Sequence, residues 1–87
     1  MQETFEFVVS NPMGLHANIA DQLARTASLY QSDFTLNYDG RTVNLKSVMG
    51  VISLGVPQKA RLSIVVSGND AKAGIAALTK KIQELAL

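Results

Sequence analysis

The sequence predicts an α+β domain of two layers, in which helices cover one face of a four-stranded antiparallel sheet. Four short segments alternate apolar and polar side chains, which is the pattern of strands with one buried face. Two longer segments carry apolar residues every three or four positions, which is the period of an amphipathic helix. At 87 residues, 47% of them apolar, the chain has the size of one small domain spanning residues 1–87. We therefore expect the element order β-α-β-β-α-β-α in a two-layer fold.

The first strand is expected over residues 4–9, where alternate positions are apolar, at Phe5, Phe7 and Val9. Residues 11–14, Asn-Pro-Met-Gly, interrupt this pattern and predict a break before the first helix. That helix is expected from about Ala17 to Tyr30. Its apolar positions recur with helical spacing, at Ile19, Leu23, Ala27 and Tyr30.

The second strand is expected over residues 34–38, because Phe34, Leu36 and Tyr38 alternate with polar residues. Asp39-Gly40 is a strong signal for a two-residue hairpin turn, so residues 42–44 should return as the third strand. A short helix should follow over residues 47–54. Ser47 is a favoured N-cap residue there, and Gly55 is a favoured residue just past the end.

The fourth strand is expected over residues 62–66, where Leu62, Ile64 and Val66 alternate with other residues. We expect Gly68-Asn69-Asp70 to end this strand and to cap the last helix. That helix has one continuous apolar stripe, formed by Ala71, Ile75, Leu78, Ile82 and Leu85. Gly74 lies inside it and should cost about 1 kcal/mol relative to alanine.

The composition excludes several kinds of site. The absence of cysteine excludes disulfides and thiolate metal sites, and a single histidine excludes a multi-histidine metal cluster, so we expect neither metal nor cofactor. A net charge of +1 argues against a general nucleic-acid binder. No apolar run approaches the roughly 20 residues that span a bilayer, and the N-terminus lacks the features of a signal peptide. We therefore expect a cytoplasmic monomer that binds neither nucleic acid nor membrane.

The one histidine of the chain, His16, stands at the entrance of the first predicted helix. The first backbone N–H groups of a helix have no partner within it, and the helix dipole is positive there, so this position favours an anion. We expect the amides near Ala17 and Asn18 to hold such an anion. An imidazole able to carry a phosphoryl group beside these donors outlines a phosphotransfer site.

Two segments carry a family resemblance: Gly14-Leu15-His16-Ala17 and residues 44–51, Asn-Leu-Lys-Ser-Val-Met-Gly-Val. Together they resemble the phosphocarrier protein HPr of the bacterial sugar phosphotransferase system, and the resemblance extends over nearly the whole chain. It implies an open-faced β-sandwich with sheet order 1-4-2-3. It also implies a cytoplasmic carrier that takes a phosphoryl group from phosphorylated enzyme I onto histidine Nδ1 and passes it to a sugar-specific enzyme IIA.

The resemblance implies roles for two residues. His16 matches the phosphorylated histidine. Ser47 matches the regulatory serine that an ATP-dependent HPr kinase/phosphorylase modifies in Firmicute-type members. Because serine is also a favoured N-cap for structural reasons alone, the two roles of Ser47 are compatible. A phosphate there would act through its negative charge on a binding face.

The chain departs from the family two and three residues after the histidine, where Asn18 and Ile19 replace the usual arginine and proline. The family's arginine helps to neutralise the phosphoryl group, whereas Asn18 donates hydrogen bonds but brings no charge. Exchanging a charge-assisted hydrogen bond for a neutral one disfavours the phosphorylated form by about 1 kcal/mol, roughly fivefold in equilibrium. We expect this change to tune the carrier without abolishing its chemistry.

A docking surface is expected on the short helix. Seven or eight residues cannot bury every side, so some of its apolar side chains should be exposed, and flexible methionine suits several partners. We expect Met49 and Ile52, with Val48, to form this surface, while Val51 and Leu54 belong to the core. Arg25 and Lys46 are candidates for pairing with acidic partners.

Two other functions remain open. In the first, the domain is a regulatory interaction module in which Ser47 phosphorylation and the surface around Met49 control a transcriptional regulator or an enzyme, with weak or no phosphotransfer by His16. In the second, it is a small ligand-binding domain, which would need a pocket lined by convergent polar groups. We do not expect the chain to be an enzyme. As a carrier, it is the substrate of one partner protein and the phosphoryl donor to another.

Overall fold

The computed structural model describes all residues 1–87 and has the predicted element order β-α-β-β-α-β-α. Its seven elements are β1 (Gln2–Val8), α1 (Ala17–Ser28), β2 (Asp33–Tyr38), β3 (Arg41–Asn44), α2 (Val48–Ser53), β4 (Arg61–Ser67) and α3 (Ala71–Glu84). Each predicted element is present, and its ends lie within two residues of the predicted ones. The helix α1 ends at Ser28, ahead of the half-buried Tyr30.

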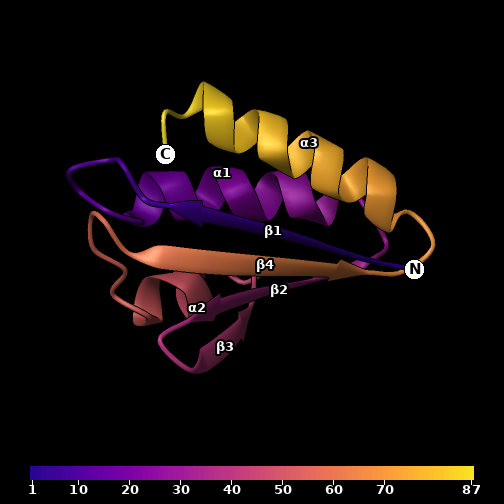
Figure 1. The fold of residues 1–87 in the computed structure, drawn as a ribbon, viewed down its shortest axis with the longest axis horizontal. Helices are drawn as coiled ribbons and strands as arrows, with labels where there is room; N and C mark the ends of the chain where they lie inside the picture. Colours follow the sequence, from indigo (N-terminus) through magenta and orange to yellow (C-terminus); the bar gives the residue numbers. More distant parts are fainter.

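The four strands form one sheet in the order β1-β4-β2-β3, with every neighbouring pair antiparallel (Figure 1). The strand β4 lies between β1 and β2, so that Ile64 pairs with Phe5 on one side and with Leu36 on the other. The order 1-4-2-3 that the resemblance implied is therefore confirmed.

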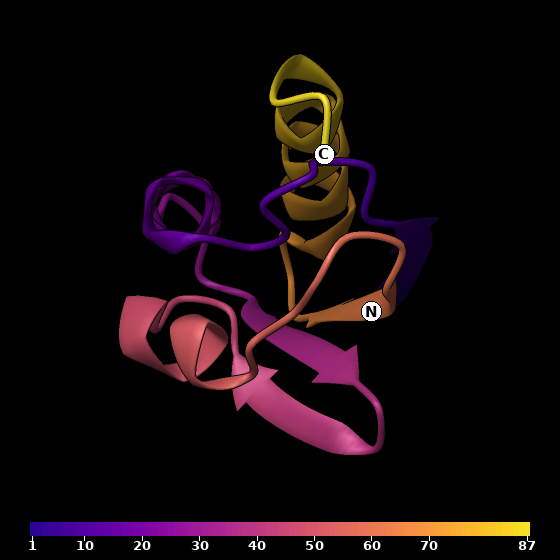
Figure 2. The same cartoon turned by 90° about the vertical axis from the view of Figure 1, so that its left-hand side faces the viewer.

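All three helices lie on one side of the sheet and leave the other side open (Figure 2). The helix-facing side chains of the central strands are buried, as are the apolar stripes of α1 and α3, and together they make a core of 19 residues. On the open face, polar side chains such as Thr35 and Asn37 are partly exposed. This division produces the two-layer, open-faced sandwich. None of the helices is long and apolar enough to cross a membrane.

The hairpin between β2 and β3 is a two-residue turn, because Tyr38 pairs with Arg41 across it. Its two central residues have positive φ, 50° at Asp39 and 78° at Gly40. That is the conformation of a type I′ turn, which matches the twist of the flanking strands. The turn predicted from Asp39-Gly40 is confirmed.

The expected cap of the last helix is confirmed by position, because Asp70 is the N-cap residue of α3. Its carboxylate makes no hydrogen bond to that helix. It accepts hydrogen bonds from the backbone N–H groups of Gln31 and Ser32, at 2.8 and 2.9 Å, and from the Ser32 hydroxyl. The carboxylate thus joins the start of α3 to the connection between α1 and β2.

Gly74 has a packing role that its helix propensity does not reveal. It is buried, and a Cβ atom placed on it would lie 2.8 Å from Cζ of Phe34. Phe34 is 1% exposed and is held by the core. The missing side chain therefore lets α3 approach the sheet closely, which offsets the intrinsic cost of glycine in a helix.

Candidate functional site

The loop before α1 is held tightly against the segment that follows α2. Gly14 has φ +67°, and a Cβ atom there would clash with the carbonyl oxygen of Val56. The next N–H group, that of Leu15, donates to the same carbonyl at 3.0 Å, and the Leu15 side chain is buried. Only glycine fits this combination of backbone angle and space. Gly14 and Leu15 therefore fix where the chain delivers His16.

His16 is the N-cap residue of α1. Its backbone is extended, with φ −79° and ψ 175°, and its carbonyl accepts the first helical hydrogen bond, from Ala20 N–H at 2.9 Å. Its side chain makes no capping hydrogen bond. The half-buried imidazole has no hydrogen-bond partner in the chain, so its nitrogens are free for chemistry.

Three backbone donors stand beside this imidazole. The N–H groups of Ala17, Asn18 and Ile19 precede the first helical hydrogen bond of α1 and have no acceptor within the chain. The first turn contains no acidic residue that would compensate the positive end of the helix dipole. Ala17 and Asn18 are exposed, whereas the Ile19 side chain is buried in the core. This arrangement suits an anion attached to His16.

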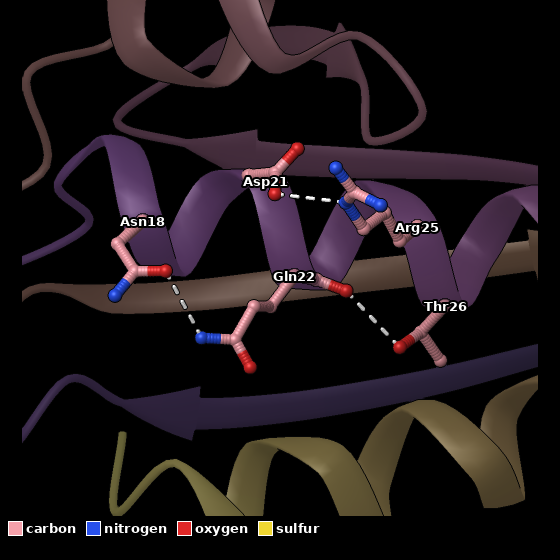
Figure 3. Close-up of polar contacts among 5 residues, drawn as sticks. All are labelled: Asn18, Asp21, Gln22, Arg25 and Thr26. Atoms are coloured by element: carbon pink, nitrogen blue, oxygen red, sulfur yellow. Dashed lines mark hydrogen bonds and ion pairs between the residues drawn. The ribbon is translucent and has the colours of Figure 1, made fainter.

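Asn18 adds a side-chain donor to this end of the helix. Its Oδ1 accepts a hydrogen bond from Nε2 of Gln22 at 3.1 Å, one turn along α1. The amide nitrogen of Asn18 therefore points away from Gln22, toward the N-terminal end of the helix (Figure 3). Sequence reasoning did not single out Gln22, although the four-residue spacing from Asn18 is the spacing of neighbours on a helix surface.

The two basic residues proposed for acidic partners are both engaged within the chain. Arg25 Nε pairs with the Asp21 carboxylate at 2.8 Å on the exposed side of α1. It lies eight residues after Ala17, about 12 Å along the helix axis. Lys46 Nζ donates to the Tyr30 carbonyl at 2.9 Å and lies 5.8 Å from the centre of the Phe34 ring. Neither cation is placed against His16 by these contacts.

Ser47 begins α2 as predicted. Its Oγ accepts a hydrogen bond from the Gly50 N–H at 3.1 Å, so it is the N-cap of this six-residue helix, and its side chain is exposed. The helix ends at Ser53, and Gly55 follows with φ +60°, the left-handed conformation expected just past a helix end. Both predicted ends of α2 are confirmed.

The apolar side chains of α2 divide between the core and the surface. Val51 and Leu54 are buried, as predicted. Met49 is 76% exposed and Ile52 is 37% exposed, whereas Val48 is half-buried and packs against the core. The helix lies at the same end of the molecule as the start of α1 (Figures 1 and 2). An adaptable apolar surface therefore shares this end with His16.

The structure has no pocket at His16 that would hold a small ligand. The larger of two surface depressions has a volume of about 690 Å³ and runs along the outer side of α1, past Arg25 and Leu29 toward Lys46. Neither His16 nor Asn18 lines it. No group of three or more His, Cys, Asp or Glu residues is arranged to hold a metal ion.

Comparison with known proteins agrees with this geometry. The sequence model of the family described as PTS HPr component phosphorylation site matches residues 3–84. The histidine-containing phosphocarrier protein of Mycoplasma superposes with a TM-score of 0.96 at 32% identity, over 98% of this chain and 97% of its own. The phosphocarrier protein HPr of Bacillus anthracis str. Ames gives a TM-score of 0.83 at 31% identity, over 92% of this chain and 95% of its own.

A related regulatory protein has the same fold. Crh, the catabolite repression protein of Bacillus subtilis, whose structure is a swapped dimer, gives a TM-score of 0.74 at 32% identity, over 90% of each chain. The open-faced sandwich with a histidine at the start of its first helix thus defines a phosphocarrier-type α+β domain. The chain belongs to the HPr family.

Proposed function

We propose that the protein is a phosphocarrier of the sugar phosphotransferase system, which accepts a phosphoryl group on His16 from phosphorylated enzyme I and passes it to an enzyme IIA. One observation carries this proposal. The imidazole of His16 is free of internal hydrogen bonds and stands at the N-terminus of α1, beside three backbone N–H groups that have no acceptor. Family membership supports the same function.

The transfer step needs no group beyond the two proteins. Nδ1 of the neutral imidazole attacks phosphorus in phosphorylated enzyme I, and the bond between phosphorus and the donor breaks. The electron pair of the broken bond stays with the donor, while the proton on Nε2 stays on His16. Transfer to enzyme IIA repeats the same exchange with His16 as the donor. The carrier is therefore a protein substrate in each step, acting in the cytoplasm.

In this protein the phosphoryl group is stabilised by backbone N–H groups and by the helix dipole at the start of α1. Ala17 and Asn18 are exposed residues whose N–H groups have no acceptor in the chain, and the helix dipole favours negative charge there. Because Arg25 is paired with Asp21 and Lys46 is bonded to a carbonyl, neither supplies a free cation to the site. Hydrogen bonds rather than an ion pair hold the anion.

A second function, regulation through Ser47, is favoured by the exposure of that residue and of its neighbour Met49. A phosphate placed on Ser47 by an HPr kinase/phosphorylase would bring negative charge to the surface that carries Met49 and Ile52. Such a change would alter which partner docks there, enzyme I or a transcriptional regulator. The two functions are compatible in one chain.

The deciding experiment is incubation of the purified protein with phosphoenolpyruvate and a general enzyme I, followed by intact-mass measurement. We expect one phosphoryl group per chain, lost on acid treatment because phosphohistidine is acid-labile. His16→Ala should keep the fold, since the imidazole makes no hydrogen bond, and should accept no phosphate. Acceptance by that variant would sink the assignment.

The matched control is Ser47→Ala, which should still accept the acid-labile phosphate. An ATP-dependent HPr kinase should label the wild type, but not Ser47→Ala, with an acid-stable phosphate. If only the acid-stable label forms, the protein is the regulatory module and His16 is not a phosphoryl carrier.

A further inference from the structure

We propose that Gln22 is a positioning residue for the phosphoryl site: it holds the Asn18 side chain so that the amide Nδ2–H2 group, rather than Oδ1, faces a phosphoryl group on His16. The inference rests on the proposed function of His16. It concerns the position at which this chain departs from its family.

The first turn of α1 offers one polar side chain to an anion. Its residues are Ala17, Asn18, Ile19 and Ala20, and only Asn18 can donate a side-chain hydrogen bond. An amide has a donor end and an acceptor end of nearly the same shape. Turned one way it binds a phosphoryl oxygen, and turned the other way its own oxygen repels that group. Whether Asn18 stabilises or destabilises a phosphoryl group therefore depends on which end of its amide faces His16.

In the structure, Gln22 holds Asn18 in the first of these two orientations. Its Nε2 donates to Asn18 Oδ1 at 3.1 Å, which occupies the acceptor end and leaves both Nδ2 protons free. Figure 3 shows the Asn18 nitrogen directed away from Gln22, toward the N-terminal end of α1. With the Gln22 amide in this orientation, turning Asn18 alone would set two NH₂ groups against each other. The pair as the structure has it therefore leaves the donor end of Asn18 free for a phosphoryl group.

The contacts of Gln22 keep this role separate from the stability of the helix. The Gln22 carbonyl is engaged independently of the side chain, as the acceptor for Thr26 Oγ1 at 3.0 Å (Figure 3). Exposed side-chain pairs at this spacing add only a few tenths of a kcal/mol to a helix. A change of the Gln22 side chain should therefore leave the fold intact and act on the anion site.

Two variants test the proposal. Gln22→Met keeps the length of the side chain and loses the amide, so that Asn18 is no longer oriented. Gln22→Glu places an acceptor beside Asn18, which should then turn its Nδ2 toward the carboxylate and its oxygen toward His16. We expect the equilibrium for phosphoryl transfer from enzyme I to fall about twofold in Gln22→Met and about fivefold in Gln22→Glu.

The same variants in an Asn18→Ala background separate orientation from charge. With Asn18 removed, Gln22→Met should have no effect, and Gln22→Glu should retain only the effect of its added charge. Thr26→Val is the matched control, because it removes a hydroxyl on the same side of α1 without touching the Asn18 amide. If Gln22→Met lowers the equilibrium equally with and without Asn18, the positioning role is wrong.

A spectroscopic readout tests the contact itself. Phosphoramidate transfers its phosphoryl group to histidine and releases ammonia, so it loads His16 without enzyme I. In the wild type, phosphorylation should shift the ¹⁵N and ¹H resonances of Asn18 Nδ2–H2, and in Gln22→Met this shift should shrink. Unchanged Asn18 amide resonances in the phosphorylated wild type would overturn the inference.

These readouts distinguish the failure of the inference from that of the proposed function. If enzyme I does not phosphorylate the wild type, the carrier function fails. The chemically phosphorylated protein still reports whether Gln22 orients Asn18. If enzyme I phosphorylates the wild type and Gln22→Met equally well, with the same Asn18 shift, the function stands and Gln22 has no part in it.

Discussion

The carboxylate of Asp70 accepts hydrogen bonds from both the backbone N–H and the hydroxyl of Ser32, 38 residues away in the sequence. It also accepts from the N–H of Gln31. Ser32 is 2% exposed, and this carboxylate is the partner of its hydroxyl. One side chain thus joins the start of α3 to the connection that leads from α1 into β2.

This cluster predicts how stability depends on pH. The hydrogen bond from the Ser32 hydroxyl, then that from the Gln31 N–H, lower the pKa of Asp70 below the ordinary value of 3.8. Because the folded pKa is the lower one, the stabilisation is present above the pKa of the unfolded chain and is lost as the pH falls through the folded pKa. Asp70→Asn should therefore unfold more easily at neutral pH and lose less further stability in acid.

Urea unfolding at a series of pH values between about 2 and 7 measures this difference. Asp33→Asn is the control, because it removes an exposed carboxylate that makes no hydrogen bond in the fold. Parallel pH profiles for the wild type and Asp70→Asn would contradict the prediction.

Alanine usually stabilises a helix relative to glycine, but at position 74 we expect the opposite. Alanine has the higher helix propensity by about 1 kcal/mol, but its Cβ would lie 2.8 Å from Cζ of the buried Phe34. Overpacking of this kind costs about 1–3 kcal/mol. We expect Gly74→Ala to lower the free energy of unfolding by about 1 kcal/mol net. Combining it with Phe34→Leu should remove part of the clash, and a more stable single variant would contradict this packing argument.

Features that depend on neighbours in the sequence were predictable, and those that depend on distant residues were not. The alternation of Phe34 and Leu36 gives a strand, and Asp39-Gly40 gives its turn, because each signal is local. Asp70 is the N-cap residue of α3, as the sequence indicates. The partners of its carboxylate lie in a loop 38 residues away in the sequence, and no local signal predicts them.

The candidate site follows the same division. His16 and its backbone donors were predictable, because a helix start always leaves its first N–H groups unpaired. The contact between Gly14 and the Val56 carbonyl depends on tertiary structure and carries no local signal. The bond from Gln22 to Asn18 is local, but its importance emerges only when the orientation of the amide is considered.

The C-terminal end of α3 offers a stabilising substitution. Ala86 has φ +52°, its N–H donates to the Gln83 carbonyl, and the N–H of the buried Leu87 donates to the Ile82 carbonyl. These two bonds form a Schellman motif, in which glycine is the favoured residue at the position of Ala86. We expect Ala86→Gly to raise the free energy of unfolding by about 1 kcal/mol.

The matched control for this substitution is Ala76→Gly, at an exposed position inside α3. There glycine has no compensating backbone role, so stability should fall by about 1 kcal/mol. Thermal or urea unfolding of the two variants should therefore give changes of opposite sign. Two losses of equal size would show that the left-handed conformation of residue 86 is not strained.

A positive charge at residue 18 should strengthen the phosphorylated state. Asn18→Arg would place a guanidinium at the start of α1, where no other side chain of the first turn is charged. Replacing a neutral hydrogen bond by a charge-assisted one favours the phosphoryl group by about 1 kcal/mol, roughly fivefold. Because Asn18 is exposed, this gain should shrink as salt screens the pair.

The measurement is the equilibrium of phosphoryl transfer between enzyme I and the variant, at low and at high ionic strength. Thr26→Arg supplies the same charge two turns further along α1 and should leave the equilibrium nearly unchanged. A gain for Asn18→Arg that persists unchanged in high salt would assign the effect to geometry rather than to charge. No gain at either salt concentration would mean that the backbone donors of Ala17 and Asn18 already satisfy the phosphoryl oxygens without help from the side chain.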